Sequence, residues 1–287
     1  MRLDIDGRNC ELESGRSILD AVKKEGLDSI MLSDRPLAAQ IGGEVFNLRF
    51  TPKKDTQIHL LRYGEDMGRR VYERTLQFLF ILAMRKEFPR ARVCVRYSLG
   101  PGLFITVDGM EEPFNEEAAL KVETEMRRLV RLKLPLERRR ISIKEALSFY
   151  EQDGQADKAK LLKWRRFSYF DVYQIDGYMD YFYGEMAPDT SYADVFRVKY
   201  VHDGAVVLLM PRNDAPDVPS DYVDLPKLNA VFHQSDEWGK LMECATVNDL
   251  NTHIQNGTIR ELVRINEALH DRGYADIADK IVQKGAK

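Results

Sequence analysis

The sequence predicts an α+β protein in which a small strand-rich module precedes a larger mixed module and a helical tail. Three observations indicate this class. Turn signals separate short apolar segments in residues 1–62, a long apolar helix opens the next region, and the last region has helical periodicity. The 287 residues are 44% hydrophobic and 31% charged, which is enough apolar material for packed cores in roughly two domains.

The first module, residues 1–63, is expected to contain five strands and one helix. The dipeptides Asp6-Gly7 and Gly42-Gly43 are hairpin signals between short apolar segments. Ser17 precedes a helix that should end at Gly26, and residues 56–61 form the last strand. The resulting order, β-β-α-β-β-β, is that of a ubiquitin-like β-grasp.

The second module, residues 64–212, is expected to open with a helix over residues 66–88, which Pro89 ends. Its apolar residues lie nearly all round, so we expect burial on several sides. Cys94 lies in an alternating run and should be a buried small hydrophobe. The remaining expected elements are strands at 93–95 and 104–107, helices at 116–132, 142–150 and 157–165, a strand-rich stretch from Phe170, and a hairpin over 196–210.

The third region, residues 213–287, should be a breaker-rich linker followed by a helical connector. The helices are expected at 226–242, 247–255, 258–272 and 274–283. The region is too poor in apolar residues to form a strong independent domain.

Charge and cysteine content limit the classes of function. The net charge of -3 predicts no bulk attraction to nucleic acid or to an anionic membrane. The run Arg138-Arg139-Arg140 is more typical of a solvated face than of a binding surface. The three cysteines form no zinc-binding pattern, and the N-terminus has no apolar leader. We therefore expect a cytoplasmic protein with no membrane partner.

Several short sequence segments resemble the N-terminal half of threonyl-tRNA synthetase. Gly-Gly-Glu-Val at 42–45 and Asp-Thr-Gln-Ile-His-Leu-Leu at 55–61 are similar to the TGS module of that family. Gly-Arg at 68–69, PFNEE at 113–117 and LPLERRRISIKEAL at 134–147 resemble its editing domain. The resemblance implies a TGS β-grasp followed by an editing-like α+β domain.

The last third resembles a different family. The segments FHQSDEWGKLMECATVNDLN (232–251) and GTIRELVRINEALHDRGYADIADKI (257–281), together with RYSLGPGLF (96–104), look like bacterial uridine kinase-like nucleoside kinases. In that family a TGS module and a synthetase-type domain precede a P-loop kinase domain, which uses ATP and Mg²⁺. This chain has no G-x-x-x-x-G-K-[ST] motif. The resemblance therefore implies a nucleoside kinase (a transferase) whose own downstream kinase domain is the partner of this chain.

The synthetase resemblance also points to candidate site residues. The family carries two histidines four apart on the first helix and a Cys and a His four apart near the end of the domain. The corresponding residues are Arg74, Phe78, Phe182 and Met186, none of which ligates zinc. We expect no metal and no catalytic residue. A surviving cleft, lined also by Arg96, Ser98 and Asp180, would bind a nucleotide or an RNA base, although apolar residues at helical spacing favour a cleft filled as core.

Three functions remain open at this point. The leading hypothesis is a non-catalytic regulatory or ligand-binding region of a uridine kinase. The second is an aminoacyl-tRNA editing-type hydrolase, and the third is a tRNA- or RNA-binding module. The five histidines, among them His59 in the last β-grasp strand, have no acidic or cysteine partner nearby in sequence and are expected to be structural or solvated rather than catalytic.

Overall fold

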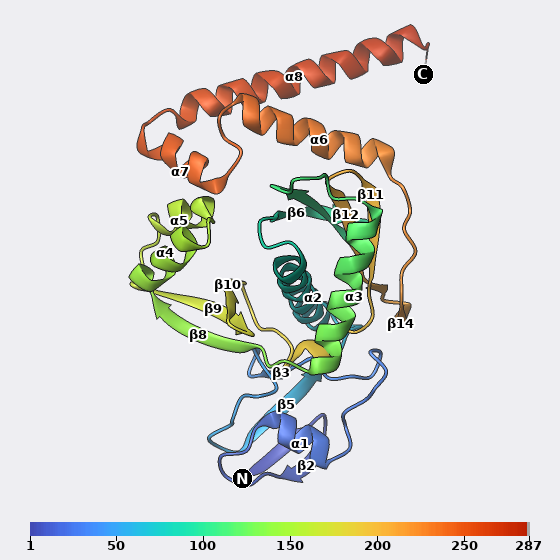
Figure 1. Ribbon diagram of the computed structural model, residues 1–287, viewed down its shortest axis with the longest axis vertical. Helices are drawn as coiled ribbons and strands as arrows, with labels where there is room; N and C mark the ends of the chain where they lie inside the picture. The colour runs from blue at the N-terminus through green and yellow to red at the C-terminus, as the bar shows by residue number, and fades with distance from the viewer. Residues whose placement is uncertain (286–287) are drawn as a thin grey trace. The chain divides into compact units, whose positions relative to one another are not determined.

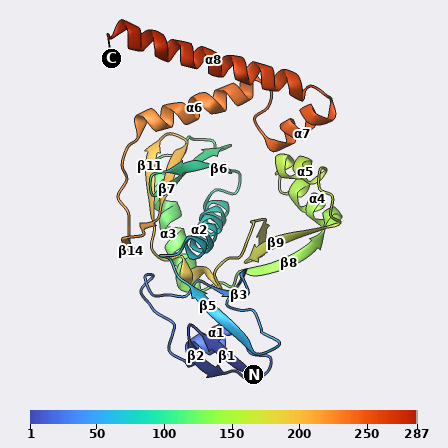
Figure 2. The ribbon, with the colours of Figure 1, turned by 180° about the vertical axis from the view of Figure 1, so that it is seen from behind.

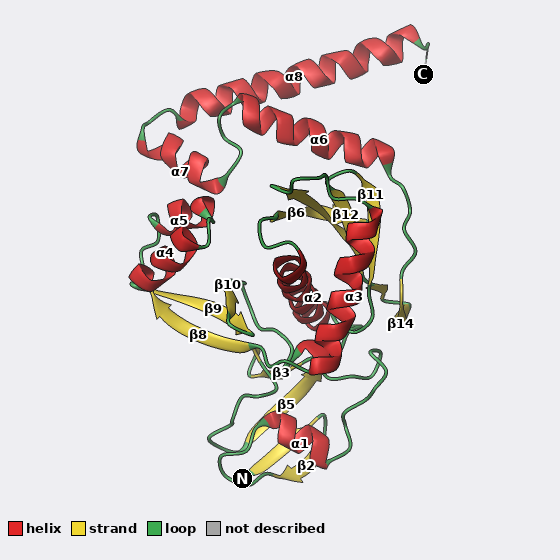
Figure 3. Cartoon of the chain, viewed as in Figure 1, coloured by secondary structure: helices red, strands yellow, loops and turns green. Residues whose placement is uncertain are grey.

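The structure is a computed structural model that describes residues 1–285. It confirms the α+β class (Figures 1 and 3). Two compact units are present: residues 1–140 with 171–225, and residues 141–170 with 226–287. The three predicted module boundaries stay a prediction.

The N-terminal module of the first unit is a β-grasp, drawn in blue in Figure 1. Its five-stranded sheet has the order β2-β1-β5-β3-β4, with β1 and β5 parallel. Ser17 caps α1 in a capping box with Asp20, and Ile18 and Val22 of this helix are buried against the sheet. The elements are β1 (Arg2–Ile5), β2 (Arg8–Glu11), α1 (Ile18–Lys24), β3 (Ala38–Ile41), β4 (Glu44–Phe46) and β5 (Thr56–Leu61).

The editing-like module of the first unit has three sheets and two long helices. The sheets have the strand orders β11-β12-β7-β6, β10-β9-β8 and β13-β14. The elements are α2 (Asp66–Glu87), β6 (Arg92–Leu99), β7 (Gly102–Asp108), α3 (Glu116–Leu132), β8 (Glu137–Ser142), β9 (Tyr169–Ile175), β10 (Tyr178–Asp180), the 3-10 helix η1 (Thr190–Tyr192), β11 (Arg197–His202), β12 (Ala205–Leu209), β13 (Pro211–Arg212) and β14 (Ala215–Pro219).

Helix α2 lies at the centre of this module, as the reverse view in Figure 2 also shows. Its residues Leu76, Phe78 and Leu79 are fully buried. This burial confirms the prediction that the first long helix is buried on several sides.

Asn115 caps α3 as expected, because its side chain accepts a hydrogen bond from the backbone N–H of Ala118.

A β-bulge interrupts strand β6, which lies at the edge of its four-stranded sheet. Val95 pairs with Ile105, but Tyr97 pairs with Phe104, so Arg96 is the extra residue. The side chain of Val95 packs with the α2 core, whereas that of Tyr97 packs with the cluster on the opposite face. Because of this one extra residue, the side chains that follow Arg96 lie on the opposite face of the sheet from the one that regular alternation would give them.

Several local predictions were wrong. Cys94 is exposed, because it lies on the open face of an edge strand. Strand β8 was not predicted, and β14 occupies part of the segment expected to be a linker. The last two expected helices form one helix, α8, which runs through Gly273; an interior glycine costs about 1 kcal/mol, which the flanking turns tolerate.

The second unit is helical. It contains α4 (Ile143–Gln152), α5 (Ala156–Leu162), α6 (Pro226–Leu241), α7 (Val247–Gln255) and α8 (Ile259–Gln283). The indole N–H of Trp164 donates to the side-chain oxygen of Asn248 at 2.9 Å and joins the α5 end to α7. Within residues 1–285, α6, α7 and α8 contain no buried residue, and no helix of this range is long and apolar enough to cross a membrane.

Candidate functional site

The expected cleft lies between α2 and the segment that follows β10. The ring of Phe78 on α2 lies 5.2 Å from the ring of Phe182 and 6.0 Å from that of Tyr178. Phe78 and Met186 are fully buried, and Phe182 packs against the same cluster. The structure therefore brings three of the synthetase-derived positions together as packed apolar side chains.

Arg74 joins the same place through its guanidinium. Its Nε donates to the backbone oxygen of Glu185 at 2.9 Å. Burial lowers the pKa of Arg74, while Tyr173 and Glu185 favour its charged form. The hydroxyl of the next residue, Thr75, accepts a hydrogen bond from the backbone N–H of Ala187 at 3.0 Å. Two side chains of α2 thus bind the backbone of Glu185 and Ala187.

The other predicted residues lie at different places. Asp180, 2% exposed at the end of β10, accepts the backbone N–H of Tyr181 at 2.8 Å. Arg96 and Ser98 are exposed on β6, where the Nε of Arg96 donates to the hydroxyl of Thr106 at 2.9 Å. Whether any of the seven binds a ligand stays a prediction.

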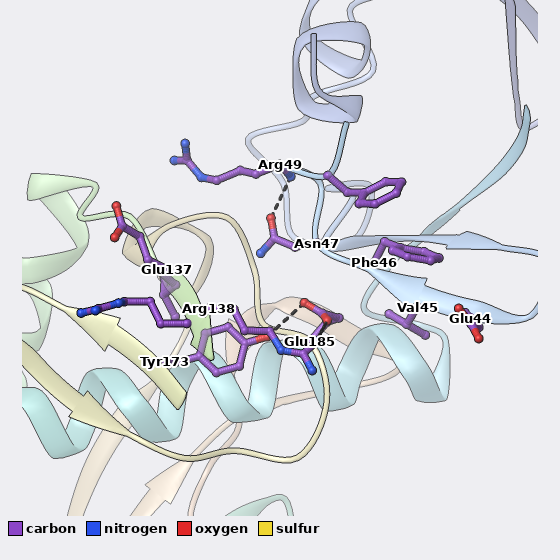
Figure 4. Close-up of a pocket in the computed structure, with 12 residues that line it drawn as sticks. Glu44, Val45, Phe46, Asn47, Arg49, Glu137, Arg138, Tyr173 and Glu185 are labelled. Carbon is purple, nitrogen blue, oxygen red and sulfur yellow. Dashed lines mark hydrogen bonds and ion pairs between the residues drawn. The ribbon is translucent and has the colours of Figure 1, made fainter. Parts of the chain in front are cut away.

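A pocket of about 760 Å³ lies beside this segment, between the β-grasp and the editing-like module (Figure 4). Both strands that border it, β4 and β8, are terminal strands of their sheets. The β-grasp side contributes Glu44, Val45, Phe46, Asn47, Arg49 and Phe50, and the opposite side contributes Leu136, Glu137, Arg138, Arg139, Tyr173 and Glu185.

Glu185 is the centre of a polar network in the wall of this pocket. The hydroxyl of Tyr173 donates to its carboxylate at 3.0 Å, and Arg138 forms an ion pair with the other oxygen (Figure 4). Arg138 also contacts Asp171 at 3.0 Å, and Arg140 contacts the same carboxylate at 2.8 Å. Burial raises the pKa of Tyr173 well above its usual range, so this hydroxyl stays a hydrogen-bond donor.

The turn over residues 46–50 is fixed to the same segment. The side-chain amide of Asn47 donates to the backbone oxygen of Met186 at 2.8 Å, and its oxygen accepts the N–H of Arg49 at 2.8 Å. The guanidinium of Arg49 donates to the backbone oxygen of Pro188 at 2.9 Å. Residues 184–189 are therefore surrounded by arginines from three elements: Arg49, Arg74 and Arg138.

Residues 1–285 contain no group of three His, Cys, Asp or Glu side chains that could hold a metal ion. The chemistry available around residues 184–189 is that of guanidinium groups, aromatic rings and the partly buried carboxylates of Glu185 and Asp189. Guanidinium groups bind phosphate and carboxylate, and aromatic rings stack on nucleobases.

Curated proteins similar to this chain are threonine–tRNA ligases. That of Clostridium kluyveri is 25% identical over 194 residues, which cover 67% of this chain and 30% of the ligase. Those of Carboxydothermus hydrogenoformans and Acetivibrio thermocellus are 27% and 28% identical over 175 and 160 residues, covering 58% and 55% of this chain. No family model matches the chain. The chain thus spans less than a third of the relatives it matches.

These relatives correct the uridine kinase interpretation, which was wrong. The similarity points to threonine–tRNA ligases and not to a nucleoside kinase or its transferase activity. The function as a regulatory region of such a kinase and the partnership with a downstream kinase domain are wrong for the same reason. The kinase resemblance rested largely on α6 to α8, whose exposed, charge-rich surfaces constrain sequence weakly.

Sequence reasoning missed most of the pocket. The sequence places Arg138 and Arg139 in a run typical of a solvated face, and Glu185 is not among the candidate site residues. The signal that could have found Arg138 is its position in LPLERRRISIKEAL, a segment already recognised as synthetase-like. Phe46 and Phe50 carry no such signal, because their rings meet only through the turn between them, with centroids 4.5 Å apart.

Proposed function

We propose that this chain binds tRNA as a module of the threonyl-tRNA synthetase editing-region type and does not hydrolyse an aminoacyl ester. One observation carries the proposal. The positions that resemblance assigns to metal-binding residues are packed side chains, Phe78, Phe182 and Met186, while arginines surround the adjacent segment 184–189. The similarity to threonine–tRNA ligases supports the choice of tRNA.

Binding would depend on local rather than overall charge. The chain carries a net charge of -3, so it lacks long-range attraction for a polyanion. Arginines can form paired hydrogen bonds with phosphate oxygens, and each phosphate contact releases counterions. Contacts to two or three phosphates would give a slope of log affinity against log salt of about -2 to -3.

The experiment measures tRNA binding and ester hydrolysis on the same protein. We expect saturable filter binding of tRNA with that salt slope, and no deacylation of mischarged tRNA above the spontaneous rate. Arg49→Gln should weaken binding. The matched control is Arg16→Gln, an exposed β-grasp arginine outside the pocket, which should bind like the wild type.

Two results would overturn the proposal. One is the absence of tRNA binding at low salt. The other is deacylation that is lost in Arg74→Ala, since this would place catalysis in the packed cleft.

A further inference from the structure

The pocket between β4 and β8 has the size and the lining of a small-molecule site. Its volume of about 760 Å³ lies within the roughly 300–1,000 Å³ typical of such sites. Aromatic rings stand on the β-grasp side, and guanidinium groups stand on both sides. An aromatic surface beside cations is complementary to a planar base that carries a phosphate.

The aromatic side of the pocket is preorganised. Phe46 and Phe50 have ring centroids 4.5 Å apart, and Phe50 is 37% exposed. The turn that carries them is closed by the bond from the N–H of Phe50 to the backbone oxygen of Asn47, at 2.9 Å. The backbone oxygen of Phe50 also accepts the N–H of Ile18 at 3.0 Å. A ring held in this way loses little entropy when a base stacks on it.

The cationic side has one arginine engaged with acids and one engaged with an amide. Arg138 pairs with Glu185 and Asp171, so its charge is largely compensated. Arg139 donates instead to the neutral side-chain oxygen of Gln174, at 2.7 Å. An arriving phosphate therefore gains more from Arg139 than from Arg138, because no carboxylate must be displaced from Arg139.

Arg49, on the β-grasp side, contacts Asp189 at the longer distance of 3.6 Å, and its side chain is 47% exposed. We propose that this pocket is a subsite for one nucleotide, with the base against Phe46 and Phe50 and the phosphate at Arg139 and the exposed part of Arg49. The subsite rests on the proposed tRNA binding and specifies which part of the RNA is held. That part is an unpaired nucleotide, because a base within a helix cannot present its face to an aromatic ring. A free nucleoside monophosphate has the same chemistry.

The first test titrates the full chain with adenosine 5′-monophosphate, adenosine and inorganic phosphate by calorimetry, and then with the other three monophosphates. The monophosphate should bind more tightly than either of its parts. Phe50→Ala should weaken its binding about 5- to 150-fold, which corresponds to about 1–3 kcal/mol for one stacked base. Phe50→Leu keeps apolar bulk without an aromatic face and should weaken binding as well.

Matched controls separate the site from general effects. Arg139→Gln should weaken binding of the monophosphate and leave binding of adenosine unchanged. Arg16, which does not line the pocket and pairs only with the exposed Glu13, should tolerate the same change, and so should the exposed Phe167 when changed to Ala. Featureless titrations with all four monophosphates, or equal affinity in Phe50→Ala and wild type, would overturn the subsite.

A second test distinguishes the two sources of the nucleotide. If the subsite holds an RNA end, removing the unpaired 3′ nucleotides from tRNA should weaken binding, and the monophosphate should compete with intact tRNA. If the monophosphate binds through Phe50 but tRNA does not bind, the subsite stands for free nucleotides and the proposed tRNA function fails. If tRNA binds wild type and Phe50→Ala equally, the proposed function stands and the subsite fails.

Discussion

A buried ion pair joins the β-grasp to the editing-like module, and its removal gives the most quantitative prediction. Arg35, which is 7% exposed, donates to both carboxylate oxygens of Asp194, at 2.8 and 3.0 Å. The same guanidinium donates to the backbone oxygens of Ser29 at 3.1 Å and Tyr192 at 3.3 Å. Replacing Arg35 with Met keeps the length of the side chain and removes every one of these donors.

The expected loss follows from the burial of the pair. Removing one partner of a buried ion pair costs about 3–5 kcal/mol, because the other charge is left without compensation. The side chain of Asp194 is 32% exposed, so water recovers part of this cost, and we expect about 3 kcal/mol for Arg35→Met. With a urea slope of roughly 1–3 kcal/mol per molar, the unfolding midpoint should fall by about 1–3 M.

Urea unfolding followed by far-UV circular dichroism measures this change. Arg16→Met removes an exposed pair with Glu13 and should cost no more than about 0.5 kcal/mol. The reasoning would be refuted if Arg35→Met shifted the midpoint as little as this control. Asp194→Asn closes a double-mutant cycle, in which a coupling near zero would show that the two side chains do not stabilise each other.

The remaining predictions concern one histidine, one core ring and one glycine. Hydrogen bonds to Glu65 and Asp6 raise the pKa of His59 in the folded protein. The contribution of protonated His59 to the stability of the fold is therefore complete below pH 6.5 and is lost as the pH rises through the pKa of the folded state. Thermal melts should show this loss of stability in the wild type and not in His59→Gln. Phe78→Ala should cost about 3–5 kcal/mol in urea unfolding, because the ring is fully buried, and a cost below about 1 kcal/mol would mean that its surroundings are loosely packed. Gly68→Ala should reduce the soluble yield and the melting temperature, since a Cβ at this position would lie 2.0 Å from the backbone oxygen of Arg62. An unchanged melting temperature would contradict this close approach.

Local signals explain which elements the sequence predicts well. The N-caps at Ser17 and Asn115 act within three residues, and each is found in the structure. Strand β8 has no such signal, because Glu-Arg-Arg-Arg does not alternate between apolar and polar residues. Its arginines are held by partners more than 30 residues away, as in the bond of Arg139 to Gln174. Pairing over such a separation cannot be inferred from a local pattern.

The candidate site divides in the same way. The packing of Phe78 with Phe182 agrees with the expectation that apolar residues at helical spacing form core. No acidic partner was expected for His59, yet its ring contacts Asp6 at 2.8 Å and Glu65 at 2.7 Å. Asp6 lies 53 residues away and is brought close by the pairing of β1 with β5. Topology supplies Asp6, whereas Glu65 lies only six residues from His59 and is a partner that the local sequence already offers.

The bulge at Arg96 also decides how the open edge of the four-stranded sheet can behave. A regular edge strand offers its free backbone groups to the edge of another molecule, which is a route to aggregation. A bulged strand bends, and an added strand cannot follow it in register. Deletion of Arg96 would straighten β6 and turn the last three residues of the strand to the wrong faces. We expect such a deletion variant to form β-rich aggregates, with thioflavin fluorescence as the readout.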